Sequence, residues 1–352
     1  MSAVALQELP QSPGVWASAW KRLKNDRVGM IALVITALFI GMVVLAQMGL
    51  IAKDWRKEVG TPFAPPHFVG KIVDGSQTAV VESTAGVNVD ISDVDPLAPR
   101  YQEWFENAAK FKTTATVKAD TLLLGGDQLG RDVFTKVVKG AQVSITVGLI
   151  AALFATIIGT VLGAVAGYFG GKVGDLLEWV YNVFTSIPYI LLMFTVAAVL
   201  KSGPLAGALG SGVWTVIIIL SVVGWTGIYR LVRAEYIKHR SREYVRAAEA
   251  IGASHSARMF VHILPNISHV VLVQLSLHVV SFIKAEVILS FLGLGVPIDM
   301  VSWGTMLSEA QNELVQGKWW QLAAATVFMA TFVTAFALLT DALRDALDPK
   351  LR

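Results

Sequence analysis

The sequence predicts an all-α polytopic membrane protein with six transmembrane helices and a small extracytoplasmic α+β insertion. Of its 352 residues, 54% are hydrophobic and only 16% are charged, whereas soluble domains carry about 25% charged residues. The apolar residues gather in six long stretches, and a helix of roughly 20 apolar residues crosses a bilayer core. The stretches are 28–52, 140–171, 179–200, 202–229, 259–294 and 319–340.

The composition also excludes several classes of protein. A mean hydropathy of +0.59 is too high for a soluble enzyme or a disordered chain. The pI near 9.0 arises from a net charge of only +3, which does not indicate a basic nucleic-acid surface. The chain contains no cysteine, so disulfides, thiolate zinc sites and cysteine nucleophiles are ruled out.

The basic residues predict that both termini are cytoplasmic, because short cytoplasmic loops carry an excess of Lys and Arg. With the N-terminus inside, the short outer loops hold only Lys201 and Lys318. The basic residues of segment 53–139 count little, since segments of that length translocate largely regardless of charge. No small-residue cleavage pattern follows the first stretch, so we interpret it as an uncleaved anchor. The inner segments contain 15 basic residues, which are Lys21, Arg22, Lys24, Arg27, Lys172, Arg230, Arg233, Lys238, Arg240, Arg242, Arg246, Arg258, Arg344, Lys350 and Arg352.

These assignments divide the chain into four parts. Residues 1–27 form a cytoplasmic segment, 28–52 the first transmembrane helix and 53–139 an extracytoplasmic subdomain. Residues 140–352 form a core of five transmembrane helices. This core includes a cytoplasmic loop at 230–265 and a C-terminal tail at 341–352.

Two of these parts contain further predicted elements. Segment 1–27 mixes tryptophans with basic residues, which suits a helix lying on the inner membrane surface; a flexible basic tail is the alternative. In the outer subdomain, Asp74 and Gly75 suit the type I′ turn of a β-hairpin over 68–83. Residues 96–111 predict a short amphipathic helix with an aromatic side.

The second stretch carries small residues at a spacing of four, namely Ala155, Gly159, Gly163 and Gly167. Such spacing lets the backbone of a neighbouring helix approach closely, so we expect a helix-packing seam. Pro188 lies inside the third stretch and should kink or break that helix.

The most informative segment is the polar loop 230–265. Helical spacing places four residues on one face of a short helix and three charged residues on other faces. The first group is Tyr244, Ala247, Ala248 and Ile251, and the second is Glu243, Arg246 and Glu249. Gly252 then ends the helix. A short amphipathic helix exposed on a membrane protein needs a partner groove; the alternative is a solvated loop.

This loop resembles the cytoplasmic signature of permease subunits in binding-protein-dependent ABC importers, which reads Glu-Ala-Ala, three residues, Gly, nine residues, Ile-x-Leu-Pro. The matching positions are Ala247, Ala248, Gly252, Leu264 and Pro265. Arg246 stands at the usual Glu position and His262 at the Ile position. Any specific role of the family's glutamate is therefore not expected in this chain, whereas the docking role of the helix is. Three segments resemble the C-type permeases of the dipeptide/oligopeptide (peptide/nickel) transport branch, namely 125–136, 286–295 with 302–307, and 341–350.

The resemblance implies a permease subunit of a type I ABC importer, in the cytoplasmic (inner) membrane of a bacterium. Its partners would be a homologous second permease in a heterodimer, two ATP-binding subunits, an extracytoplasmic solute-binding protein and the lipid bilayer, with no nucleic acid. As a transport subunit, the chain would bind no cofactor and would not be an enzyme. It has no Gly-x-x-x-x-Gly-Lys-Ser/Thr loop, so it would not bind ATP by that route; ATP and Mg would bind to the partner ATPase subunits. The ATPase-coupling residues would be Glu243, Tyr244, Arg246, Ala247, Ala248, Ile251, Gly252, Leu264 and Pro265.

The expected solute is a di- or oligopeptide. The same architecture also serves nickel complexes, glutathione, peptide antibiotics and oligosaccharides. A membrane-embedded enzyme is a more distant alternative, because no paired aspartates, Ser/His pair or zinc motif occurs in the spans. A self-contained channel or secondary transporter would not need the docking loop.

Two charges, Lys284 and Glu286, lie well inside a predicted span, where charges usually face a cavity or each other. Their spacing of two puts them on different faces, so they are possible pathway or gate residues rather than a mutual pair. A structural role competes for Glu286, and snorkelling towards the outer surface competes for Lys284. The histidines at 255, 262 and 269 are spaced by seven residues, which would place them on one face of a helix. Pro265 interrupts that face, and no metal site is expected.

Overall fold

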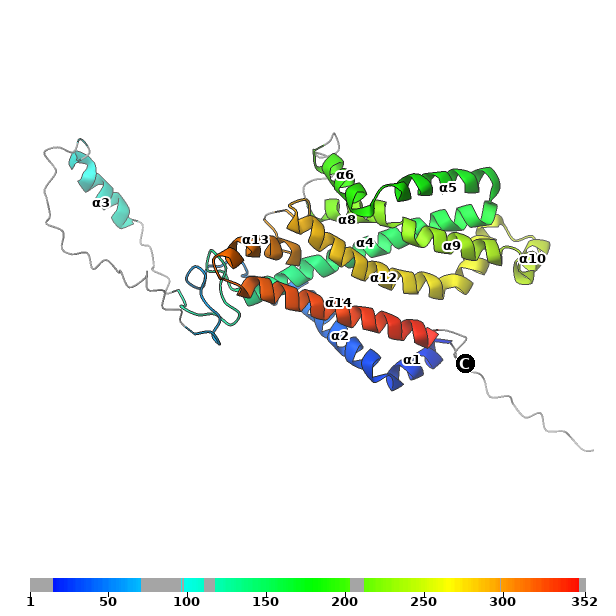
Figure 1. Cartoon of the computed structure of the whole chain (residues 1–352), viewed down its shortest axis with the longest axis horizontal. Coiled ribbons are helices and arrows are strands. Elements are labelled where there is room, and N and C mark those ends of the chain that lie inside the picture. The colour runs from blue at the N-terminus through cyan, green and yellow to red at the C-terminus, as the bar shows by residue number, and fades with distance from the viewer. Residues whose placement is uncertain are drawn as a thin grey trace, which may run out of the picture. The chain divides into compact units, whose positions relative to one another are not determined.

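This computed structural model describes residues 15–70, 96, 98–110, 118–202, 212–297 and 299–347. The chain forms two compact units: Met1–Trp55 together with Phe134–Arg352, and Arg56–Val133. In its described residues, the first unit is built from helices, the longest of which run roughly side by side (Figure 1).

The first unit begins with α1 (Val15–Asn25) and α2 (Arg27–Gln47), and the long helix α4 (Val133–Phe169) follows the second unit. The chain continues through α5 (Gly171–Ser186), α6 (Tyr189–Ser202), α8 (Val213–Gly224), α9 (Thr226–His239), α10 (Glu243–Ala250) and α11 (His255–Ala257). A π-helical turn, η2 (Arg258–Ile263), leads into α12 (Leu264–Phe291), followed by α13 (Trp303–Val315) and α14 (Trp320–Leu347).

Within the described residues, four helical segments are long and apolar enough to cross a membrane: Arg27–Gln47, Val133–Phe169, His255–Phe291 and Trp320–Ala346. Two bent pairs, α5 with α6 and α8 with α9, raise the number to six if each pair is one span. The six predicted stretches therefore correspond to four continuous helices and two bent pairs, and the all-α membrane fold is confirmed.

The third stretch is the one that differs most from a simple span. The axes of α5 and α6 meet at 96°, and the break falls at Ile187 and Pro188. Ile187 has an extended backbone (φ −97°, ψ 134°), because the ring of a following proline disfavours helical geometry. The pair α8 and α9 bends by 42° at Trp225.

The second stretch begins earlier than the apolar run indicates, at Val133 rather than residue 140. The first turns of α4 contain Lys136 and Lys139, whose charges made this segment look like part of the outer loop. The side chain of Lys136 is nevertheless only 1% exposed and is ion-paired with Glu309. A distant carboxylate thus permits a charged residue inside a packed helix.

The small residues of α4 face α9. A methyl group at Gly159 would lie 2.4 Å from the carbonyl oxygen of Trp225, and one at Gly163 would lie 2.6 Å from that of Tyr229. At Gly167 the corresponding distance to the carbonyl oxygen of Arg233 is 2.5 Å. Any larger side chain at these glycines would push the two helices apart, and Ala155 is likewise fully buried.

The short helix α1 packs against α2 and the end of α14. Leu23 of α1 forms a buried cluster with Ala32 of α2 and Leu339 of α14. Between the two N-terminal helices, Asp26 caps α2 by accepting a hydrogen bond from the backbone N–H of Val28 at 3.0 Å. The predicted helix in segment 1–27 is thus present, although residues 1–14 lie outside the described part.

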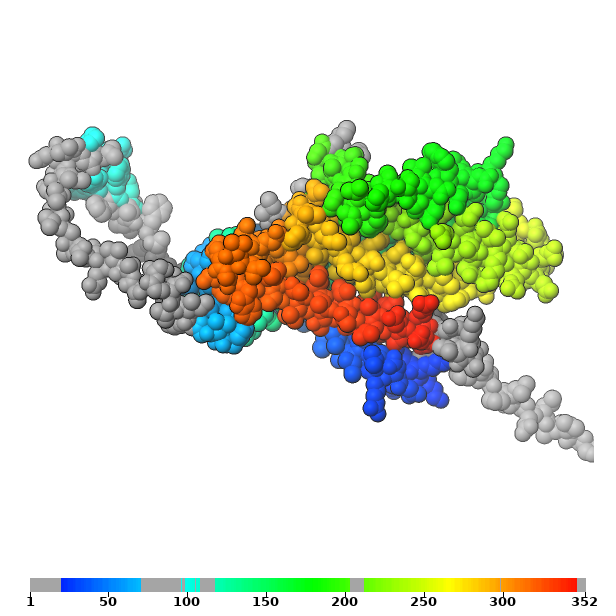
Figure 2. Space-filling view, in the orientation of Figure 1, coloured from blue at the N-terminus to red at the C-terminus, as the bar shows by residue number. Residues whose placement is uncertain are grey.

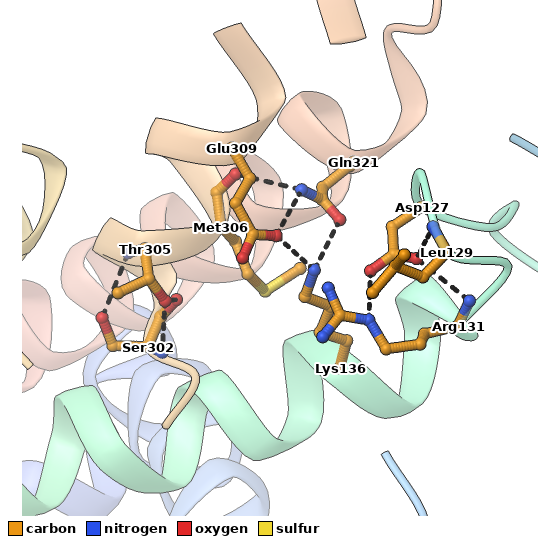
Figure 3. Close-up of polar contacts among 9 residues, drawn as sticks. All are labelled: Asp127, Leu129, Arg131, Lys136, Ser302, Thr305, Met306, Glu309 and Gln321. Carbon is orange, nitrogen blue, oxygen red and sulfur yellow. Dashed lines mark hydrogen bonds and ion pairs between the residues drawn. The ribbon is translucent and has the colours of Figure 1, made fainter. Parts of the chain in front are cut away.

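The second unit contains α3 (Tyr101–Lys110) and the 3-10 turn η1 (Ala98–Arg100). Its described residues are joined by isolated β-bridges, such as Gly60 with Ala119 and Pro66 with Leu122. The carboxylate of Asp127 is fully buried; it accepts backbone hydrogen bonds from Leu129 and Arg131 and pairs with the Arg131 side chain at 2.6 Å (Figure 3). Most of the predicted hairpin at 68–83 lies outside the described residues.

Candidate functional site

The loop singled out by the sequence folds into α10, which lies at one end of the helical unit, beyond α9 and the start of α12 (Figure 1). The helix ends at Ala250, and Gly252 adopts a positive φ of 87°. Only glycine takes up this conformation without strain. A Cβ built on Gly252 meets no atom within 4 Å, so the backbone angle alone, and no close approach within this chain, requires glycine here.

One side of α10 is anchored in the core. Val245 is 2% exposed and belongs to a buried cluster with Val232 and Tyr236 of α9 and Ile263 of η2. Ala248, one turn later, is also buried. Sequence analysis placed Ala248 on the docking face and did not single out Val245. Their i, i+3 spacing puts both residues on one face of a helix, and this was the signal that could have predicted the buried side of α10.

An exposed face of α10 beside this anchor carries apolar side chains. Ile251 is 85% exposed and Tyr244 is 37% exposed, and Ala247 between them is exposed as well. The phenol of Tyr244 is 2.8 Å from Nδ1 of His239 at the end of α9, which orients its ring. Burial raises the pKa of Tyr244, with Arg242 opposing the shift, so the hydroxyl stays protonated at neutral pH. Glu243 and Arg246 are also exposed on this helix.

Both chain segments that flank α10 are tied to the end of α4. On one side, the Arg240 guanidinium donates to the carbonyl oxygens of Gly167 and Tyr168 at 3.4 Å each. On the other side, the Tyr168 hydroxyl and Nη2 of Arg258 both lie 3.0 Å from Nδ1 of His255. Because a guanidinium can only donate, this ring nitrogen accepts.

Arg258 connects this contact back to α10. Its Nη1 pairs with Glu249 at 2.6 Å, and its guanidinium carbon lies 5.8 Å from the centre of the Tyr168 ring. We call the group Tyr168, Arg240, Glu249, His255 and Arg258 the α4–α10 clamp. Sequence reasoning assigned none of these side chains to coupling, because the residues meet only after α4 and the loop have packed.

The end of the signature marks the start of α12. Leu264 is half-buried and Pro265 is exposed in the first turn of α12. The π-helical turn η2 precedes them and holds Met259, whose carbonyl oxygen accepts a hydrogen bond from the Tyr236 hydroxyl at 3.0 Å.

Comparison with known proteins decides the family. Residues 159–352 match the family described as "Binding-protein-dependent transport system inner membrane component", and residues 14–66 match the "N-terminal TM domain of oligopeptide transport permease C". The first match covers more than half of the chain. The chain belongs to this permease family.

Two named relatives are similar along most of their length. The permease is 33% identical to the dipeptide transport system permease protein DppC of Bacillus subtilis over 95% of this chain and 85% of that protein. It is 38% identical to the oligopeptide transport system permease protein OppC of Escherichia coli K12 over 65% of this chain and 72% of that protein. An inward-facing structure of the MetNI methionine ABC transporter matches with a TM-score of 0.48 and 16% identity, covering 60% of this chain and 96% of that one.

The two intramembrane charges of the permease lie in different environments. Glu286 is fully buried, and its carboxylate accepts a hydrogen bond from the Ser290 hydroxyl at 2.6 Å. The same hydroxyl oxygen accepts the backbone N–H of Val296 at 3.1 Å, which fastens the chain after α12. Lys284 is exposed on the opposite side of α12.

The end of the permease that holds α13 contains a polar network that the sequence did not reveal. Nζ of Lys136 donates to Glu309 of α13 at 2.5 Å and to the side-chain oxygen of Gln321 of α14 at 3.1 Å (Figure 3). The amide nitrogen of Gln321 in turn donates to the carbonyl oxygen of Met306 at 3.2 Å. These contacts join α4, α13 and α14.

No group of three metal-ligating side chains occurs within the described residues. His255, the first of the three evenly spaced histidines, belongs to the α4–α10 clamp, and Nδ1 of its ring is already engaged there.

Proposed function

We propose that the permease is the C-type subunit of an ATP-driven, binding-protein-dependent importer of di- or oligopeptides. It forms half of the translocation pathway with a homologous second permease, and both of its termini are cytoplasmic. Two ATP-binding subunits, which hold ATP and Mg, supply the energy, and an extracytoplasmic binding protein delivers the solute. The names of the relatives, which are peptide permeases, support the choice of solute.

The observation that carries this proposal is the exposed apolar side of α10. A helix in a polar loop that leaves Ile251 almost fully exposed has an unsatisfied apolar surface. An amphipathic helix of this kind fits a hydrophobic groove on another protein. We assign that groove to an ATP-binding subunit.

The anchoring of α10 supports a mechanical role. Val245 and Ala248 fix the helix to the core, and the α4–α10 clamp fixes the segments on either side of it. Closure of the ATPase subunits would then move α10 together with α4 and α9, which are packed along their glycine seam. Rigid-body motion of packed helices is a common form of such transitions.

Lys284 is our candidate pathway residue. A charged side chain exposed at membrane depth is costly against lipid, so this face of α12 should meet water, solute or the second permease. Glu286 is assigned a structural role instead, because its carboxylate is enclosed and bonded to Ser290.

The proposal is tested by replacing Ile251 with Asp in the complete transporter and measuring how much ATP-binding subunit co-purifies. Burying a new carboxylate in an apolar groove should abolish co-purification. The matched control is Val315→Asp, because Val315 is apolar, 90% exposed and located at the end of α13. Equal recovery of the ATP-binding subunit with both variants would contradict the assignment of the groove partner.

The solute is tested separately with the purified binding protein and labelled peptides. Peptide uptake that requires the binding protein and ATP supports the proposal. Uptake of a nickel complex, glutathione or an oligosaccharide in place of peptides would keep the importer and change the solute.

A further inference from the structure

A cavity of about 460 Å³ opens on the membrane-spanning part of the permease, between α5, α9 and α12. Four polar side chains line it: Tyr181 of α5, Thr226 and Arg230 of α9, and Gln274 of α12. Its remaining lining is apolar, formed by Gly227, Leu231 and Ala234 of α9. Ligand sites of a few hundred cubic ångströms commonly combine an apolar lining with a few convergent polar groups.

The cavity lies where a predicted span meets the cytoplasmic loop 230–265, of which Arg230 is the first residue. Arg230 precedes His239, the last residue of α9, by about 14 Å along the helix axis, and Gln274 follows Leu264, the first residue of α12, by about 15 Å. Both residues therefore lie well inside their helices rather than at the helix ends. The Arg230 side chain is exposed towards this space rather than buried in the protein.

A second arginine on α9 shows what is unusual about Arg230. Arg233, almost one turn later, pairs with Glu178 of α5 at 3.4 Å, so its charge is balanced within the chain. Among the described residues, by contrast, no carboxylate forms an ion pair with Arg230. A guanidinium that lines a cavity without a counter-charge is suited to bind an anion.

The cavity also has a rigid wall. The ring of Tyr181 stacks on Tyr229 with centroids 5.2 Å apart, and the methyl group of an alanine at Gly227 would lie 3.8 Å from the amide nitrogen of Gln274. The polar groups from α5, α9 and α12 are therefore held around one space by packed backbone rather than by flexible loops.

We infer that this cavity is a transient site for the carboxylate of the transported solute, held by the guanidinium of Arg230 with Gln274 as a further donor. The inference rests on the proposed peptide transport, which makes the C-terminal carboxylate the anion. A guanidinium matches the geometry of a carboxylate, with two parallel N–H···O bonds. The open, apolar remainder of the cavity accepts side chains without selecting among them, as transport of varied peptides requires.

A partner surface is the competing occupant, namely a carboxylate of the second permease. The hollow shape favours the solute, because a protein surface that covered Arg230 would have to fill a cavity of this volume. Co-purification of the second permease distinguishes the two, since only an interface residue would weaken assembly.

The test compares uptake of one tripeptide as the free acid and as the C-terminal amide, using the complete reconstituted transporter with its binding protein. Arg230→Gln should lower uptake of the acid about tenfold and change uptake of the amide less than twofold, whereas Arg230→Lys should retain the preference for the acid. The control Arg233→Gln removes a neighbouring charge of α9 outside the cavity and should affect acid and amide alike. Because the binding protein is unchanged, its own preference cancels when each variant is compared with the unmodified transporter.

Equal losses of acid and amide uptake in Arg230→Gln would overturn the carboxylate site while leaving peptide transport in place. Loss of the second permease from the purified complex would assign Arg230 to a subunit interface and overturn the site as well. If the unmodified transporter imports neither peptide, the proposed function fails, and this site fails with it.

Discussion

The two ends of the helical unit are built in opposite ways. At the end that holds α13, charged and polar side chains are turned inwards: Lys136 is 1% exposed and bonded to Glu309 and Gln321. At the end that holds α10, the charged side chains of Glu243 and Arg246 are exposed instead. Exposed apolar residues occur at both ends, with Ile251 85% and Val315 90% exposed, so the ends differ in how they hold their charged side chains. Figure 2 shows these ends on opposite sides of the unit, with α13 in orange and α10 in yellow-green.

This difference indicates which end is fixed and which is free to act on a partner. The network around Lys136 joins α4, α13 and α14, and Trp303 adds hydrogen bonds to Ser144 and to the carbonyl oxygen of Val137. Breaking such buried contacts is costly, so these helices should move together. The contacts around α10 lie nearer the surface, where a partner protein can replace or strengthen them.

The largest expected effect concerns the side of the membrane on which each end lies. Because the chain has no cysteine, single cysteines at the exposed positions Asn312 in α13 and Ser254 after α10 can be labelled selectively. An impermeant maleimide added to intact cells should label Asn312→Cys fully and Ser254→Cys only after lysis. The reverse pattern would invert the predicted orientation, and labelling of both from outside would contradict the six-span topology.

The next effect tests whether the α13 end is locked. Lys136→Met should lower the free energy of unfolding by about 3 kcal/mol, at the low end for a broken buried ion pair because Glu309 is partly exposed. The control Lys238→Met breaks the exposed pair with Glu235 near α10 and should cost at most about 1 kcal/mol. Thermal unfolding of the purified permease measures both, and equal losses would remove the distinction between the ends.

A smaller, functional effect tests the α4–α10 clamp. Arg258→Gln removes the ion pair to Glu249 and the hydrogen bond to His255, so α10 should transmit less motion to α4. We expect about fivefold less uptake per ATP hydrolysed, with normal assembly and ATP hydrolysis. Arg258→Lys should restore part of the loss, because a lysine keeps the charge but lacks the planar fork. An unchanged ratio of uptake to hydrolysis in Arg258→Gln would exclude the clamp from coupling.

The same contrast explains which features could be predicted from the sequence. The membrane spans were predictable because each depends on a continuous apolar run, and the break at Pro188 follows from local backbone chemistry. The size of the bend there, 96°, depends on how α5 and α6 pack and was not predictable. The early start of α4 was missed because Lys136 looks like a loop residue until Glu309, far along the chain, is placed beside it.

The candidate site likewise contains residues that could be predicted from the sequence and residues that could not. Helical spacing found the exposed residues Tyr244, Ala247 and Ile251 of α10, since an exposed face is a property of one helix. It missed the α4–α10 clamp because these contacts join three separate segments. Arg230 was counted only as an inner-loop charge, and its place in a cavity depends on α5 and α12.

The smallest expected effect is the difference in stability lost when one of two helix caps, one at each end of the helical unit, is removed. The Ser302 hydroxyl accepts the backbone N–H of Thr305 at 3.2 Å, and the Thr305 hydroxyl accepts that of Ser302 at 2.8 Å, in a capping box whose serine is fully buried (Figure 3). Ser254 caps the three-residue helix α11 through a 3.2 Å bond from Ala257, at an exposed position. Ser302→Ala should cost about 1–2 kcal/mol, because the freed N–H of a buried turn finds no water. Ser254→Ala should cost less than about 0.5 kcal/mol, as surface changes usually do, since water can take over the bond. Thermal unfolding of the two alanine variants measures this difference, and equal costs would mean that the α13 end is no more tightly built than the α10 end.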